Sequence, residues 1–248
     1  MRIHLIFKIF FLLIFINGCT SNTNYNDDDL NIDIDDFSDS LIVEDNLNTQ
    51  RESPYSFIAL GDSYTIGEGV NEDERWPNQF VDVAYENGVD FDQPMIIAET
   101  GWKTYDLLNA INQTNFTKKY DYISLLIGVN NQFNSRPIDE FEEDLNKLMD
   151  EMKRIKKNDG NIIIISIPDW GYTPFGQSND MSDISEKINL FNSSLRKFAS
   201  TNDLKYVDVT EISRRAINEP DLITNDNLHP SGIMYLEWAK KIYNIWID

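Results

Sequence analysis

The chain has 248 residues, of which 42 are acidic and 21 are basic, so its formal net charge is −21 at neutral pH. A surface of that sign repels nucleic acids and anionic bilayers, which argues against nucleic-acid binding. A single cysteine excludes an internal disulfide, and two histidines are too few for the usual ligand set of a catalytic zinc. We therefore expect neither a metal nor a cofactor.

Residues 1–18 are typical of an export signal. Arg2 and Lys8 precede an unbroken apolar run from Ile9 to Ile16. This run is far shorter than the about 20 apolar residues that a membrane-spanning helix needs. We predict a signal peptide that ends at residue 18.

The only cysteine follows directly, and Ile16-Asn17-Gly18-Cys19 resembles a bacterial lipobox. The resemblance implies that Cys19 is acylated through its sulfur and becomes the first residue of the mature protein. The protein would then be an extracytoplasmic lipoprotein of a bacterial cell membrane or outer membrane, with Cys19 as its membrane contact. The alternative is an ordinary cleaved signal with an incidental cysteine.

Residues 19–53 predict an extended tether. Between Thr20 and Gln50 the sequence has nine acidic residues and no basic one. Such a stretch repels itself and has too little apolar surface for a core. We expect it to separate the anchor from a folded domain at 54–248, which is long enough for one sizeable core.

Strand-like and helix-like stretches alternate along this domain. Several strand candidates are apolar on both faces, as in 162–165, which is typical of a sheet covered on both sides. The strand candidates are 55–60, 94–98, 120–127, 161–167 and 205–209. The helix candidates are 76–86, 104–112, 138–157, 182–200 and 231–247. Five strand–helix repeats predict an α/β fold, a three-layer, doubly wound, parallel five-stranded sheet with helices on both faces.

The chemically interesting residues follow these strands. Gly61-Asp62-Ser63 follows the first strand, and His229 is the only histidine after the predicted signal, three residues after Asp226. A serine at a strand end, with an Asp and a His near the far end of the chain, is the layout of a serine hydrolase. Ligands of such sheets bind beyond the carboxyl ends of the strands, so we expect these segments to meet at one edge.

Four blocks in order resemble the SGNH, or GDSL-type, hydrolase family: Gly61-Asp62-Ser63, Gly101, Gly128-Val129-Asn130 and Asp226-Asn227-Leu228-His229. The chain departs from the family pattern at Tyr64, where leucine is frequent, and at Asn131, where aspartate is frequent. Neither position carries the family's chemistry. The resemblance implies a flavodoxin-like sheet and an oxyanion hole made by the backbone N–H groups of Ser63 and Gly101 and the side-chain amide of Asn130. Asn131 is the rival donor.

The residue types agree with these roles. A serine hydroxyl is a weak nucleophile until a neutral imidazole accepts its proton, so Ser63 needs His229 as its base. A carboxylate three residues earlier on the same face would fix the imidazole tautomer, which assigns Asp226 as the third catalytic residue. Asp62 stays outside the catalytic set because it has the position of a residue that caps the turn.

We therefore expect a serine esterase that hydrolyses acyl esters of small molecules, glycans or lipids through an acyl-enzyme on Ser63. A carbohydrate O-deacetylase of the same family is the first alternative, and a non-catalytic binding lipoprotein on the cell surface is the second. The aromatic residues within 169–176 line either a substrate pocket or the core. No long apolar insertion follows the candidate loops, which favours short acyl groups.

Overall fold

The computed structural model describes residues 54–247. The predicted signal peptide, the predicted acylation site Cys19 and the predicted tether lie outside the described residues. Among residues 54–247, no helix combines the length and the apolar character needed to cross a bilayer.

Five parallel strands form one sheet in the order β2-β1-β3-β4-β5, which confirms the predicted fold class. Successive strands are added to one side of β1 and then to the other, so the topological switch point lies between β1 and β3. The strands are β1 (Phe57–Gly61), β2 (Met95–Ala98), β3 (Tyr120–Leu126), β4 (Lys156–Ile165) and β5 (Lys205–Val207).

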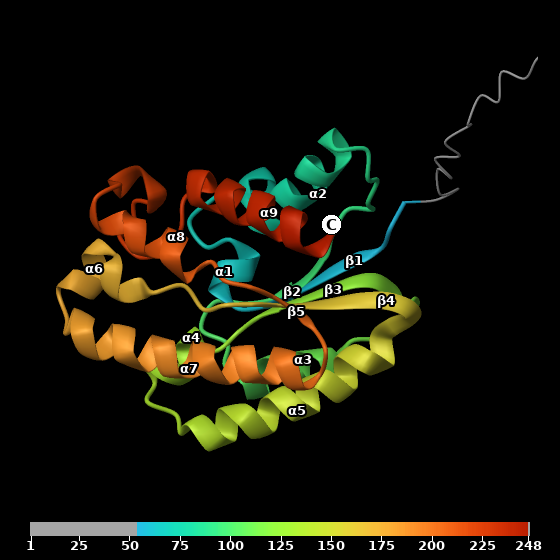
Figure 1. Ribbon diagram of the computed structural model, residues 1–248, viewed down its shortest axis with the longest axis horizontal. Helices are drawn as coiled ribbons and strands as arrows, with labels where there is room; N and C mark the ends of the chain where they lie inside the picture. The colour runs from blue at the N-terminus through green and yellow to red at the C-terminus, as the bar shows by residue number, and fades with distance from the viewer. Residues whose placement is uncertain (1–53, 248) are drawn as a thin grey trace, which may run out of the picture. The chain divides into compact units, whose positions relative to one another are not determined.

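Helices cover both faces of the sheet (Figure 1). On one face α2 (Trp76–Glu86) packs against α9 (Gly232–Trp246), and on the other α5 (Ile138–Ile155) lies between α3 (Thr104–Gln113) and α7 (Met181–Thr201). This coverage explains the run of isoleucines in β4, whose side chains at 163, 164 and 165 are all fully buried. The short helices are α1 (Ser63–Ile66), α4 (Val129–Phe133), α6 (Pro174–Gln177), α8 (Thr210–Arg214) and the 3₁₀ turns η1 (Glu72–Glu74), η2 (Trp170–Tyr172), η3 (Arg215–Ile217) and η4 (Pro220–Leu222).

The predicted boundary between α5 and β4 was wrong. The helix ends at Ile155 and the strand begins at Lys156, whereas the sequence predicted a helix to 157 and a strand from 161. Two features explain the early start. Lys156 pairs with Tyr120 across a register shift in the sheet, and its Nζ donates to the carbonyls of Lys157 and Gly160. The apolar pattern of the sequence does not reveal a lysine that bonds to nearby carbonyls, so it could not predict this start of the strand.

Strands β4 and β5 also end two residues earlier than predicted, at Ile165 and Val207. The Ser166 N–H still donates to the Val207 carbonyl at 2.9 Å, but the residues after it bond to side chains. The Ile167 N–H donates to Asn192 Oδ1 at 2.8 Å, and the Val209 N–H donates to Ser166 Oγ at 2.8 Å. These polar contacts fix the chain where it leaves the sheet toward the carboxyl edge.

Candidate active site

Ser63 begins α1 directly after β1, on a tight strand-to-helix turn. Gly61 is required there, because a Cβ at this position would lie 2.1 Å from Thr65 Oγ1 and 2.5 Å from the Leu126 carbonyl oxygen. Asp62 caps the turn through Oδ1, which accepts the Tyr64 N–H at 3.1 Å. The turn thereby holds Ser63 at the carboxyl edge of the sheet.

Asp62 is fully buried beside Ser63. Burial raises the pKa of its carboxyl group to about 7, because the bond from the Tyr64 N–H and other backbone bonds offset the loss of hydration only in part. Its Oδ2 atom has no hydrogen-bond partner among the described residues. Asp62 therefore holds the turn, but burying its carboxyl group with one oxygen unbonded lowers the free energy of unfolding.

Asp226 and His229 are joined by a compact turn before α9. Asp226 Oδ1 accepts the backbone N–H groups of Leu228 at 2.8 Å and His229 at 2.9 Å, while its Oδ2 lies 2.6 Å from His229 Nδ1. Asn227 between them has a φ of 66°. The spacing of three residues was predicted as a helical turn, but the structure has an Asp-centred turn that brings both groups together.

This turn also sets the charge of Asp226. Partial burial alone would raise the pKa of Asp226, but the bonds from the His229 backbone and ring and from Leu228 outweigh it and lower the pKa to about 2. The carboxylate is thus ionised beside Nδ1, and Nε2 is the ring nitrogen left for a substrate or a serine.

The two candidate oxyanion segments lie on either side of Ser63. Gly101 follows β2 with a φ of +86°, a backbone conformation suited to glycine. Asn130 lies on α4 after β3, and its Nδ2 donates to the Trp102 carbonyl at 3.0 Å. That bond uses one amide hydrogen and orients the side chain, so the other hydrogen remains for a ligand.

Asn131, the rival donor, has a different environment. Its side chain is buried, accepts the Thr104 N–H at 3.1 Å and donates to Thr104 Oγ1 at 2.9 Å. Both ends of its amide are occupied in joining α4 to the start of α3. Asn131 therefore has a structural role, and Asn130 is the better donor.

One cavity of about 160 Å³ brings the candidates together. It is lined by Ser63, Gly101, Asn130 and His229, whereas Asp226 stands behind the imidazole ring. The cavity also has an apolar lining, which includes Tyr64, Val129, Phe133, Trp170, Phe175 and Leu228. The candidate nucleophile, the candidate base and the candidate oxyanion donors thus lie around one small apolar space, which is the arrangement that acyl transfer needs.

The aromatic loop after β4 lines this cavity and is held in place from behind. Trp170 Nε1 donates to Gln132 Oε1 at 2.8 Å, and the buried Asp169 pairs with Arg214 Nε at 3.0 Å. The sequence left open whether the aromatic residues of 169–176 line a substrate pocket or the core. Trp170 and Phe175 line the pocket, although Trp170 is also largely buried.

Sequence reasoning missed Phe133, because α4 was not predicted. The signal was present: a helix that starts at Val129, after Gly128 as its N-cap, places Asn130 and Phe133 one turn apart on the same face. It also missed the pair of Asp169 and Arg214, which are 45 residues apart in the chain.

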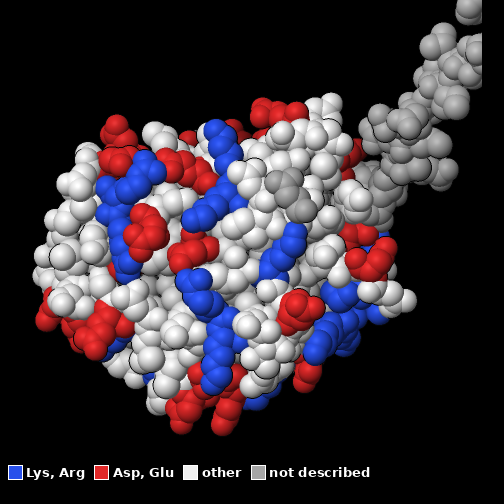
Figure 2. Space-filling model, in the orientation of Figure 1, with Lys and Arg blue, Asp and Glu red and all other residues white. Residues whose placement is uncertain are grey.

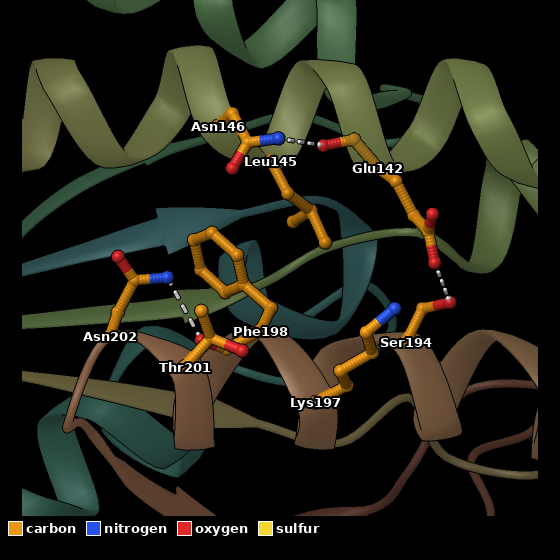
Figure 3. Close-up of a pocket in the computed structure, with 8 residues that line it drawn as sticks. All are labelled: Glu142, Leu145, Asn146, Ser194, Lys197, Phe198, Thr201 and Asn202. Atoms are coloured by element: carbon orange, nitrogen blue, oxygen red, sulfur yellow. Dashed lines mark hydrogen bonds between the residues drawn. The ribbon is translucent and has the colours of Figure 1, made fainter.

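A second groove, of about 170 Å³, lies between α5 and α7 (Figure 3). Its polar side chains bond mainly to one another or to nearby carbonyls: Ser194 donates to Glu142 at 2.7 Å, and Asn202 donates to the Phe198 carbonyl at 2.9 Å. None of the predicted site residues lines it. The chemistry therefore belongs to the cavity at the carboxyl edge.

Known structures share this fold. A lipase, Lip_vut3, from a goat rumen metagenome superposes with a TM-score of 0.64 at 18% identity, covering 77% of this chain and 97% of that one. An acetylxylan esterase, Axe2, from Geobacillus stearothermophilus superposes with a TM-score of 0.61 at 17% identity, covering 77% and 94%. At these identities the likeness shows the fold alone.

Sequence comparison goes further. The chain is 30% identical over 154 residues to a multidomain esterase of Ruminococcus flavefaciens, a stretch that is 60% of this chain and 18% of that protein. The model of the GDSL-like Lipase/Acylhydrolase family matches residues 59–235, a segment that contains Ser63, Gly101, Asn130, Asp226 and His229. Since that match spans well over half of the sequence and every wall of the cavity, the chain belongs to the GDSL-like lipase/acylhydrolase family.

Proposed function

We propose that the protein is a serine esterase that hydrolyses short-chain acyl esters through an acyl-enzyme on Ser63. The observation that carries the proposal is the cavity, which joins Ser63, His229, Gly101 and Asn130 around one small apolar space. Membership of the lipase/acylhydrolase family and the esterase name of the Ruminococcus flavefaciens relative support it.

The proposed reaction has two halves. Ser63 Oγ attacks the acyl carbonyl and its proton passes to His229 Nε2, while the Ser63 and Gly101 N–H groups and the Asn130 amide stabilise the oxyanion. The bond to the alcohol then breaks, and the alcohol leaves with the proton from His229. Water attacks the acyl-enzyme in the same way, which releases the carboxylic acid and returns the proton to Ser63.

Asp226 orients the His229 ring throughout this cycle without itself exchanging a proton. Its Oδ2 at 2.6 Å from Nδ1 fixes the tautomer with Nε2 free and stabilises the imidazolium that forms in each half.

Cavity size supports short acyl groups. A space of about 160 Å³ is close to the roughly 150 Å³ of a protein cavity that accepts benzene. Each further methylene of the acyl chain strengthens binding only if the enzyme buries it against apolar surface. Across p-nitrophenyl esters of increasing acyl length, we expect catalytic efficiency to peak at about two to four carbons.

The test of the mechanism is direct. Ser63→Ala and His229→Ala should each abolish hydrolysis of p-nitrophenyl acetate in a protein that keeps its circular dichroism spectrum, and a fluorophosphonate should label wild type at Ser63 and leave Ser63→Ala unlabelled. A folded Ser63→Ala variant with wild-type activity contradicts the acyl-enzyme. A folded wild-type protein that neither reacts with the probe nor hydrolyses any ester would instead be a binding lipoprotein.

We also propose that the enzyme is exported and held at a bacterial membrane by acylated Cys19. The charged and apolar pattern of residues 1–18, the lipobox-like Ile16-Asn17-Gly18-Cys19 and the acidic stretch that follows support this proposal.

A further inference from the structure

The mouth of the cavity has two exposed aromatic rings. Phe133 is 54% exposed and Phe175 is 39% exposed. Their ring centroids lie 5.4 Å and 5.8 Å from that of Trp170, which is only 6% exposed and stands between them. Apolar rings grouped beside a site and open to water are typical of a surface that binds a ligand. We call Phe133 and Phe175 the aromatic rim.

The aromatic rim is held rigidly. Trp170, which both rings contact, donates its Nε1 hydrogen to the buried Gln132. Helix α6, which contains Phe175, is capped by the Thr173 side chain. It is bonded to the turn between Asp226 and His229, because the Phe175 N–H donates to the Asn227 carbonyl at 3.0 Å. A pre-organised apolar surface loses little freedom when a ligand covers it.

The other side of the mouth is polar. Thr100 lines the cavity after β2, and its Oγ1 donates to Glu68 Oε2 at 2.5 Å. The strand order places Thr100 on the β2 side of Ser63 and the aromatic rim on the β3 and β4 side. Glu68 does not line the cavity itself, but its bond to Thr100 holds it next to the mouth. A ligand at the mouth therefore has aromatic rings on one side and the Thr100 hydroxyl, with Glu68 beside it, on the other.

The course of the reaction assigns this mouth to the alcohol. The acyl group stays bonded to Ser63 through the acyl-enzyme, so it suits the enclosed base of the cavity beside Tyr64 and Val129, which are 3% and 7% exposed. The alcohol must leave, and water must enter, through the open side. Phe133, Phe175 and Thr100 are exposed residues of the cavity lining, and Glu68 is bonded to Thr100.

We propose that the mouth binds a saccharide, so that the ester hydrolysed is an acylated sugar hydroxyl. A sugar ring has an apolar C–H face that stacks on aromatic rings and hydroxyl groups at its edge that bond to carboxylates. This matches the two unlike sides of the mouth. A lipid alcohol would need a long apolar channel, and a simple aryl alcohol would make no use of Glu68. The inference rests on the proposed esterase function.

The test varies the alcohol at constant acyl group. Initial rates of acid release are measured for ethyl acetate, p-nitrophenyl acetate and a monoacetylated methyl glucoside. The variants are Phe133→Ala/Phe175→Ala and Glu68→Gln. The matched control is Tyr85→Ala, which removes a ring that is 71% exposed on α2, outside the cavity.

In the double aromatic variant, the ratio of kcat/KM for the sugar ester to that for ethyl acetate should fall about tenfold, the scale of two lost aromatic contacts. Most of the fall should be in KM. In Glu68→Gln, the ratio of the sugar ester to p-nitrophenyl acetate should fall, and Tyr85→Ala should change neither ratio.

Three results would overturn the saccharide inference and leave the esterase function standing. First, wild type could hydrolyse ethyl acetate, p-nitrophenyl acetate and the sugar ester with the same kcat/KM. The double variant could lose all three substrates equally, or it could lose p-nitrophenyl acetate alone. If folded wild type hydrolyses none of the esters, the proposed function itself fails.

Discussion

Asn130 and Asn131 are adjacent residues of one type with opposite environments. Asn130 faces the cavity with an amide hydrogen to spare, whereas the amide of Asn131 is bonded at both ends to Thr104. Asn130→Ala should lower kcat for p-nitrophenyl acetate by roughly a hundredfold, the usual scale for one oxyanion donor, with little loss of stability. Steady-state kinetics and urea unfolding measure the two effects.

Asn131→Ala is the matched control and should behave in the reverse way. It leaves the buried Thr104 N–H without its partner, which costs roughly 1–3 kcal/mol of unfolding free energy, while the Thr104 hydroxyl keeps its bond to Asp144. Turnover should change far less than in Asn130→Ala. If Asn131→Ala is the variant that loses turnover while the protein stays stable, the oxyanion assignment must move to Asn131.

Asp62 makes stability depend on pH. Its pKa is about 7 in the fold and near 3.8 in the unfolded chain, so the folded state holds a proton that the unfolded state has lost between these values. Stability should therefore fall as pH rises from about 4 to 7, by about 4 kcal/mol as an order of magnitude. Asp62→Asn removes this dependence, which urea unfolding at pH 4.5 and 7.5 would measure.

The comparison is between wild type and Asp62→Asn, so that other titrating groups cancel. Asp82→Asn, at an exposed position on α2, serves as control and should keep the wild-type slope. A wild-type protein and an Asp62→Asn variant with equal stability differences between the two pH values would show that Asp62 does not carry the raised pKa.

Residue chemistry was largely readable from the sequence. Ser63, Gly101, Asn130 and His229 stand out by type and by position after strands, and the structure places all four around one cavity. The roles of these residues remain predictions until the variants are made. What could not be read is the contact geometry of Asp226, because a helical turn and an Asp-centred turn give the same spacing of three residues.

At the scale of elements, the long helices and strands were predictable and the short connecting helices were not. The boundaries predicted for α2 agree with the structure, since its apolar face repeats over eleven residues. Helices α1, α4 and α6 have four or five residues each and end too soon to show a period. These three short helices contain Ser63, Asn130 and Phe175, so the least predictable elements line the site.

The loop after β4 depends on one buried ion pair. Asp169 is fully buried and pairs with Arg214 Nε at 3.0 Å, and Arg214 Nη2 donates to Asn189 Oδ1 at 2.7 Å. Arg214→Met should leave a buried carboxylate without its partner, at roughly 3–5 kcal/mol of unfolding free energy. It should also lower kcat/KM, because η2 and α6 hold Trp170 and Phe175. Thermal unfolding and p-nitrophenyl ester kinetics test both effects.

The neighbouring residue provides the control. Arg215 pairs with Glu219 and Glu237 on the surface and is not among the residues that line the cavity, so Arg215→Met should alter stability and kcat/KM little. Equal effects of the two substitutions would mean that the buried pair does not support the loop.

At the scale of the whole molecule, charge is spread over the domain. Figure 2 shows basic and acidic side chains interspersed on one face, without one large basic patch. Most ion pairs of the described residues join positions three or four apart in the sequence, such as Lys187 with Asp183. The net charge of −21 disfavours attraction to an anionic bilayer, so we base the proposed membrane attachment on the lipid at Cys19.

Cys19→Ser should accordingly release an active enzyme from the membrane. The expected result is wild-type specific activity toward p-nitrophenyl acetate in the soluble fraction after cell fractionation, while the wild-type chain sediments with membranes. Normal signal cleavage in the variant is the control, read from the N-terminal sequence of the product. A processed Cys19→Ser chain that still sediments with membranes would refute the lipid anchor.

Both ends of the described chain reach the same edge of the sheet. Tyr55 and Trp246 pack against Tyr122 at the start of β3, with ring centroids 5.3 Å and 5.0 Å away, whereas the cavity lies where the strands end. The enzyme is thus suited to circular permutation, with a short peptide joining residue 247 to residue 54 and new ends opened at the exposed Gly88 turn. Such a permutant keeps every strand pairing and leaves the mouth of the cavity unobstructed, so the polypeptide order and the catalytic architecture are separable.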